Sequence, residues 1–93
     1  MSVEVRIPLD LQKFTAGREI VEVTGKTVGE CLDGLEIKFP RIKQQLCDEQ
    51  GRLLNFYYIF VNSDSPYPAE LAKPVKDGDV LSIIPLIIPI GGG

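Results

Sequence analysis

The chain has 93 residues, 44% hydrophobic residues and a net charge of −3, which fits one globular domain with its own core. The acidic balance argues against nucleic acid as a partner, because nucleic-acid-binding surfaces are basic. The sequence has no histidine, the commonest general base and metal ligand, so we expect neither an enzyme nor a metal site.

The N-terminal part of the chain predicts a hairpin of two strands. In "SVEVRIP" every second residue is apolar, which is typical of a strand with one buried face. In "REIVEVTG", Val21 and Val23 share a face in the same way, although Ile20 beside Val21 blurs the phase. A loop that contains "TAGR" connects the two strands.

The segment "TVGECLDGLEIKFP" has the period of a helix. Its apolar residues form one helical stripe, at Val28, Cys31, Leu32, Leu35 and Phe39. Thr27 and Glu30 predict a capping box, and Pro40 ends the helix. Gly29 and Gly34 each weaken a helix by about 1 kcal/mol, so packing must stabilise it. A glycine at such a position often marks close approach to a strand.

After a short helical turn in "RIKQQLCDEQGR", the segment "NFYYIFVN" is the strongest strand former of the chain. Alternation directs Ile59 toward the helix and leaves three rings on the opposite face, those of Phe56, Tyr58 and Phe60. We expect these rings either to form a partner surface or to be covered by loops. A turn at "KDGD" leads into the last strand, where Leu81 and Ile83 share a face.

The order strand, strand, helix, strand, strand predicts an α+β fold of the β-grasp type, with a mixed sheet of about four strands on one main helix. The right-handed crossover rule places the two terminal strands side by side and parallel, so that the last strand is central. We expect this domain to cover residues 1–86 and a flexible C-terminal tail to cover residues 87–93.

The two cysteines, Cys31 and Cys47, form no CxxC motif and are too few for a zinc site. Both a disulfide and two free buried thiols are compatible with the sequence. The N-terminus has no secretory signal, and the apolar tail is shorter than the ~20 residues of a membrane-spanning helix. We therefore expect a cytoplasmic protein that is monomeric alone and has no membrane partner, metal or bound cofactor.

The C-terminal "IGGG" is the remaining unusual feature. A terminal carboxylate is ionised at neutral pH and becomes an acyl donor only after activation, for instance as a mixed anhydride with AMP. Glycine lets the backbone thread a narrow channel, so we expect Ile88, Ile90, Gly91 and Gly92 to enter a partner enzyme. Terminal glycines alone would also suit a frayed end or a linker remnant.

The order of elements, "VNSD" after the aromatic strand, "KDGDVLSIIP" and the terminal diglycine resemble the MoaD/ThiS family of ubiquitin-like sulfur carriers. In such proteins an E1-like enzyme uses ATP to adenylate the C-terminal glycine, which a sulfur donor converts to a thiocarboxylate. The resemblance implies that Gly93 carries this group, or Gly92 if the last residue is trimmed first. The length looks closer to the molybdopterin and cysteine branches than to the thiazole carriers.

The resemblance thus implies a protein cosubstrate, not an enzyme, that donates sulfur in molybdopterin or tungstopterin biosynthesis. Its expected partners are the E1-like enzyme and an acceptor enzyme, such as the large molybdopterin synthase subunit or a cysteine synthase. Three alternatives stay open: a carrier for cysteine or thiamin thiazole synthesis, a ubiquitin-like protein modifier, and a β-grasp interaction module whose glycines are incidental.

Overall fold

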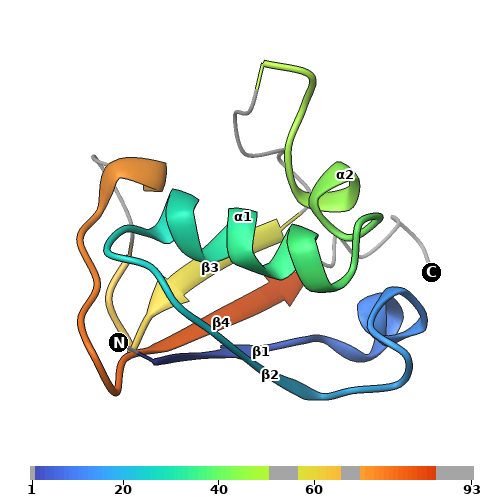
Figure 1. The fold of residues 1–93 in the computed structure, drawn as a ribbon, viewed down its shortest axis with the longest axis horizontal. Coiled ribbons are helices and arrows are strands. Elements are labelled where there is room, and N and C mark those ends of the chain that lie inside the picture. The colour runs from blue at the N-terminus through green and yellow to red at the C-terminus, as the bar shows by residue number, and fades with distance from the viewer. Residues whose placement is uncertain (1, 51–56, 66–69, 86–93) are drawn as a thin grey trace, which may run out of the picture.

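The computed structural model describes residues 2–50, 57–65 and 70–85. One sheet of four strands carries helix α1 across one face (Figure 1), which confirms the expected α+β, β-grasp fold. The predicted domain boundary after residue 86 and the predicted flexible tail lie outside the described residues. The elements in chain order are β1 (Val3–Arg6), the 3-10 helix η1 (Leu9–Phe14), β2 (Ile20–Val23), α1 (Val28–Lys38), α2 (Lys43–Leu46), β3 (Tyr57–Val61), the 3-10 helix η2 (Glu70–Ala72) and β4 (Val80–Pro85).

The sheet has the strand order β2-β1-β4-β3. β1 runs parallel to β4, with Val5 opposite Leu81, and antiparallel to β2. β3 runs antiparallel to β4, with Ile59 opposite Ile83. The predicted parallel pairing of the first and last strands is therefore confirmed, β4 is central, and β2 and β3 form the two edges.

The core lies between α1 and the sheet face that it covers. The predicted stripe of α1 is buried at Val28, Cys31, Leu32 and Leu35, and Phe39 packs partly against it. Each strand contributes alternate residues that are at most 4% exposed, namely Val3, Val5, Val21, Val23, Ile59, Val61, Leu81 and Ile83. The ambiguous phase of the second strand is thereby settled, since Val21 and Val23 point inward and Ile20 points outward.

A side-chain cap begins α1, as predicted. The Glu30 backbone N–H donates to Thr27 Oγ1 over 3.1 Å, and the Lys26 N–H donates to the Glu30 carboxylate over 2.9 Å. The second bond of the capping box therefore comes from the residue before the N-cap and not from the N-cap itself. The helix ends at Lys38, two residues before Pro40.

The segment between β1 and β2 is more ordered than the loop that the sequence suggested. It contains η1, which buries Leu11, and a turn in which Ala16 and Gly17 have φ of 55° and 80°. The buried Thr15 hydroxyl donates to the Arg18 carbonyl oxygen over 2.8 Å and holds this turn closed. Within the described ranges, no helix is long and apolar enough to cross a lipid bilayer.

Candidate functional site

The candidate site is the end of β4, where the chain continues from Pro85 into residues 86–93. The tail residues that the sequence singled out lie outside the described residues, as does Phe56 of the aromatic group. The tail residues concerned are Ile88, Ile90, Gly91, Gly92 and Gly93. The structure therefore describes the surface from which the tail starts.

An apolar patch lies on the sheet face opposite α1, beside the end of β4. Tyr58 and Ile84 are cross-strand neighbours, and each is 44% exposed. The rings of Tyr58 and Phe60 have centroids 6.1 Å apart and planes inclined by 43°, and Phe60 is half-buried. We call these three residues the open-face patch. The predicted outward orientation of Tyr58 and Phe60 is confirmed, and Ile84 joins them.

Charged side chains border the open-face patch on β1. Arg6 lies opposite Ser82 in the sheet and pairs with Glu4, the two charged groups lying 3.0 Å apart. Because both groups are substantially exposed, this ion pair contributes little to stability. Its charges lie exposed at the border of the open-face patch.

A hydrogen bond joins η1 to β3, the strand beside the start of the tail. Tyr57 lies opposite Pro85, and its hydroxyl donates to Asp10 Oδ2 over 2.9 Å. Burial, followed by this hydrogen bond to a carboxylate, raises the pKa of Tyr57 to about 12. No sequence pattern indicates this contact, because Asp10 and Tyr57 are far apart in the chain.

The "VNSD" and "KDGD" motifs meet at the opposite end of β4. Asn62 Nδ2 donates to Asp79 Oδ1 over 3.1 Å, and the Val80 N–H donates to Asn62 Oδ1 over the same distance. The Lys76 N–H donates to Asp79 Oδ2 over 2.9 Å. The backbone bond from Lys76, with that from Asn62, lowers the pKa of Asp79. These motifs therefore join the end of β3 to the start of β4, at the end of the strand that lies away from the start of the tail.

The two cysteines are free and buried, so the disulfide alternative is not realised in this structure. Burial is the main reason why the pKa of Cys31 rises to about 11, and burial also raises that of Cys47. A thiol of this kind is a poor nucleophile, since the thiolate is the reactive form. In the described ranges, no cluster of three or more His, Cys, Asp or Glu residues is arranged to hold a metal ion.

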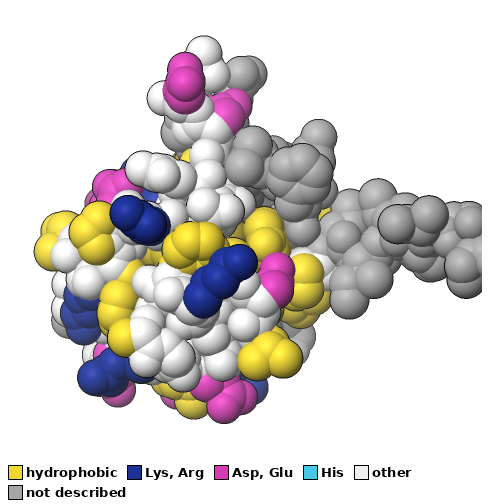
Figure 2. Space-filling model, turned by 90° about the vertical axis from the view of Figure 1, so that its right-hand side faces the viewer, with side chains coloured by type: hydrophobic (Ala, Val, Ile, Leu, Met, Phe, Trp, Pro, Cys, Tyr) yellow, Lys and Arg dark blue, Asp and Glu magenta, His cyan; other side chains and the backbone are white. Residues whose placement is uncertain are grey.

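Hydrophobic and basic side chains lie side by side over the end of the molecule where α1 and β4 finish (Figure 2). Residues of η1 and of the α1 C-terminus line a hollow there, namely Lys13, Phe14, Lys38, Phe39, Pro40 and Arg41. This mixture suits a contact with another protein better than a site for a small polar molecule.

Residues 5–93 match the sequence profile of the ThiS family. The chain belongs to the ThiS family. CysO in the crystal structure of the Amycolatopsis orientalis BexX/CysO complex shares 37% identity with it, with a TM-score of 0.87 over 92% of this chain and 97% of that chain. CysO of Mycobacterium tuberculosis shares 33% identity, with a TM-score of 0.86 over 91% of this chain and 99% of that one.

A third similar structure is SAMP1, a small archaeal modifier protein from Haloferax volcanii. It shares 28% identity and a TM-score of 0.78 over the full length of both chains. No protein of curated function matches the sequence significantly. Membership of the ThiS family confirms the resemblance to ubiquitin-like sulfur carriers, and the similar structures include both CysO proteins and a modifier.

Proposed function

We propose that this ThiS-family protein is a sulfur carrier whose C-terminal glycine is adenylated and then converted to a thiocarboxylate. The family match carries the proposal, because it extends to residue 93 and so includes the terminal glycines. The reactive residue is Gly93, or Gly92 if a protease removes the last residue. Central strand β4, which ends at Pro85, gives the tail a fixed point of origin on the body.

The proposed chemistry takes place on an activating enzyme that binds ATP. The terminal carboxylate attacks the α-phosphorus of ATP and releases pyrophosphate. A sulfide equivalent then attacks the carbonyl carbon of the acyl adenylate and releases AMP. This chain supplies the acyl group, which glycine leaves unhindered, and acts as a protein cosubstrate, not as an enzyme. It needs no bound cofactor of its own for either step.

We propose that the open-face patch, with Phe56 near it in sequence, docks on the activating enzyme and on the acceptor enzyme. The exposed Tyr58 and Ile84, with the half-buried Phe60, would orient the body while the tail enters the active site. The related CysO from Amycolatopsis orientalis forms a complex with BexX, which supports a carrier that binds partner proteins. Both partners would be cytoplasmic.

Membership of the ThiS family does not identify the sulfur acceptor. The similarities to CysO and SAMP1 do not distinguish molybdopterin from cysteine or thiazole synthesis. The molybdopterin pathway and its synthase partner therefore stay a prediction. A protein modifier is the second candidate, because the likeness to SAMP1 covers the whole of both chains. Both functions would begin with the same adenylate.

Intact mass spectrometry tests the carrier function. We expect incubation of the protein with ATP, its cognate activating enzyme and sulfide to raise the mass by the difference between sulfur and oxygen. A variant that lacks Gly92 and Gly93 should stay unchanged, and one that lacks Gly93 alone should react only if trimming is part of the pathway. An unmodified wild-type protein beside a competent enzyme would refute the proposal. Adducts with target lysines in the source cell would favour the modifier.

A further inference from the structure

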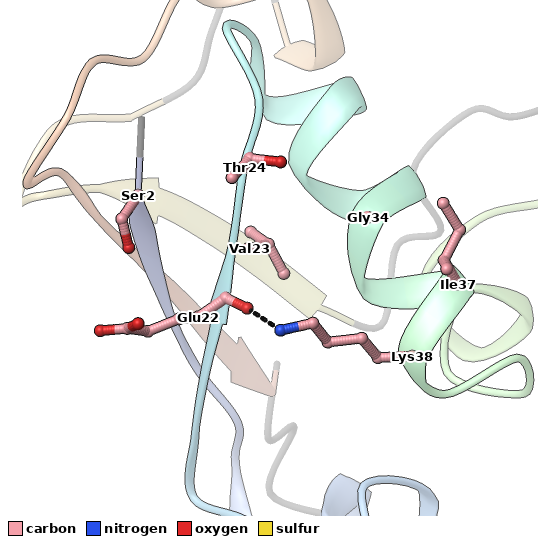
Figure 3. A pocket seen from close by; sticks show the side chains of 7 residues that line it. All are labelled: Ser2, Glu22, Val23, Thr24, Gly34, Ile37 and Lys38. Atoms are coloured by element: carbon pink, nitrogen blue, oxygen red, sulfur yellow. Dashed lines mark hydrogen bonds between the residues drawn. The ribbon is translucent and has the colours of Figure 1, made fainter.

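A groove separates α1 from the edge strand β2. It has a volume of about 340 Å³, and residues of both elements line it (Figure 3). We call it the β2 groove and define it by Ser2, Glu22, Val23, Thr24, Gly34, Ile37 and Lys38. Two further hollows share Lys38 with it, one along β2 and one toward η1. The groove and these hollows follow the edge of the sheet that lies farthest from β3.

The backbone of β2 is open along this edge. The Ile7 N–H donates to the Glu19 carbonyl oxygen over 2.7 Å, which sets the phase of the β1–β2 ladder. Because antiparallel pairing alternates, the backbone groups of Ile20 and Glu22 point away from β1. Neither N–H has a hydrogen-bond acceptor among the described residues. The Glu22 carbonyl oxygen accepts from Lys38 Nζ, which reaches across from α1 (Figure 3).

Basic side chains outnumber acidic ones around the groove and its adjoining hollows, although the chain as a whole has a net charge of −3. Four cations line these hollows, namely Lys13, Arg18, Lys38 and Arg41. In the part of the chain that the structure describes, ion pairs join only Arg6 to Glu4 and Lys43 to Asp33. The Glu22 carboxylate points away from Lys38 (Figure 3). The four cations are thus available to an external anionic group.

Apolar surface accompanies these charges. Ile37, which lines the groove, is 82% exposed, and Ile20, on the adjoining part of β2, is 47% exposed. Phe39 is half-buried and lines both adjoining hollows. A strand placed beside β2 would direct alternate side chains to the two sides of the sheet, where it would meet this apolar surface.

We propose that the β2 groove binds an extended segment of a partner protein, rich in Asp and Glu with alternating apolar residues, as an added strand beside β2. The outward backbone groups of Ile20 and Glu22 would pair with the segment, and its carboxylates would meet the four cations. Lys38 would exchange the Glu22 carbonyl for a carboxylate and free that carbonyl for pairing. The partner binds on the edge opposite the open-face patch, so this goes beyond the carrier function.

The charges disfavour two other occupants. Residues 86–93 of the chain, "LIIPIGGG", have no Asp or Glu and include a proline that cannot donate from its nitrogen. A second copy that paired its β2 with this one would bring its own Arg18 and Lys38 together with Glu19 and Glu22, so it would offer no net negative charge to the four cations. An acidic segment of a different protein is therefore the occupant that this surface fits.

Titration of the ¹⁵N-labelled full chain with a synthetic peptide that alternates isoleucine or valine with glutamate tests the proposal. We expect the amide signals of β2 and of residues 34–38 to shift, and those of Tyr58 and Phe60 to stay. The same peptide with lysine in place of glutamate should cause no shift. No ATP or activating enzyme is present, so the result is independent of the carrier function.

Two variants test the mode of binding. Glu22→Pro removes an outward N–H and leaves the β1 ladder intact, and we expect it to weaken binding about tenfold relative to Glu22→Ala. Lys38→Glu should weaken binding by a similar factor, and melting curves establish that each variant is folded. Equal affinity of Glu22→Pro and Glu22→Ala would overturn the proposal. Peptide-induced signal shifts confined to the open-face patch would also overturn it, as would self-association of the protein through β2. A third contrary result would be a shift of the β2 signals when residues 86–93 are deleted and no peptide is added.

Discussion

The two glycines of α1 occupy different surroundings, although both weaken the helix to a similar degree. A Cβ on Gly34 would lie 3.4 Å from the Thr24 carbonyl oxygen and 3.5 Å from Val23 Cβ, which are ordinary contacts. A Cβ on Gly29 would lie 3.1 Å from the Leu71 carbonyl oxygen, so the η2 segment would have to move. The expected close approach to a strand is therefore found at Gly34, whereas Gly29 approaches η2.

Alanine at these two positions should separate helix propensity from packing. Gly34→Ala should raise the free energy of unfolding by up to about 1 kcal/mol, because alanine favours the helix and its methyl group fits. Gly29→Ala should gain less or lose stability, since the same propensity is offset by the contact with Leu71. Urea denaturation of both variants measures the difference. A larger gain for Gly29→Ala would mean that the η2 segment yields easily.

Asp79 makes stability depend on pH in the acid range. Hydrogen bonds from the Lys76 N–H and from Asn62 lower its pKa in the folded state. Its contribution to stability is therefore complete above the unfolded pKa of about 4 and is lost as the pH falls through the folded pKa. Asp79→Asn should melt at a lower temperature than the wild type at pH 7, and the two melting temperatures should converge as the solution is acidified. A constant difference across this range would contradict the assignment.

Contacts with distant parts of the chain hold η1 in place. Its stretch "LDLQKF" has no helical or strand period, and it is fixed by burial of Leu11 and by the bond from Tyr57 to Asp10. Patterns within a segment predicted the strands and α1 because each buries one regular face. They could not predict η1, since its partner Tyr57 follows it by 47 residues.

Tyr57→Phe tests the anchoring of η1. Loss of the hydrogen bond to Asp10 should lower the free energy of unfolding by about 0.5–1 kcal/mol, with the ring packing retained. Because the folded pKa of Tyr57 is raised to about 12, its contribution is present below the unfolded pKa of about 10 and is lost as the pH rises toward 12. Urea denaturation at neutral pH and ultraviolet titration of the tyrosines measure both effects. A normal titration of all tyrosines would argue against the bond.

The candidate site was predictable in part, for a similar reason. Alternation within β3 gave the outward orientation of Tyr58 and Phe60. It could not give their neighbour Ile84, because the register between β3 and β4 depends on the connection between them and on the Asn62–Asp79 bonds. The β2 groove was not predicted, since the four cations of the groove and its adjoining hollows come from η1, the approach to β2, α1 and the turn after α1. Only the folded chain brings them together.

At the scale of the whole molecule, the two ends of β4 have different surroundings. The motif bonds around Asp79 close one end of this strand, and the tail leaves the other end at Pro85. The buried core of the described residues runs from Val3 to Ile83. If the tail acts as proposed, changes in the tail should affect chemistry without affecting the fold.

Gly92→Val tests this separation. A branched side chain near the reactive carboxylate should block adenylation, because a channel that fits the unhindered glycine backbone would leave no room for it. The melting temperature should equal that of the wild type, since the described core ends at Ile83. Pyrophosphate release and differential scanning calorimetry measure the two effects. A large fall in melting temperature would show that the tail contributes to the core.

Tyr58→Asp should distinguish the open-face patch from the β2 groove, because the two surfaces lie at opposite edges of one sheet. A charge in the centre of a docking surface is costly to desolvate, so kcat/KM for adenylation should fall about tenfold or more. Tyr58 is 44% exposed, so the melting temperature should change little.

Ile37→Asp is the matched control, since it also adds a carboxylate at an exposed apolar residue, but on the surface of α1 that lines the β2 groove. It should leave adenylation unchanged and should weaken binding of the acidic peptide by repulsion, whereas Tyr58→Asp should leave that binding unchanged. Equal losses of adenylation in both variants would mean that the activating enzyme contacts both surfaces. In that case neither surface would have a separate role, and the rigid body between them would serve as a single recognition unit for one partner.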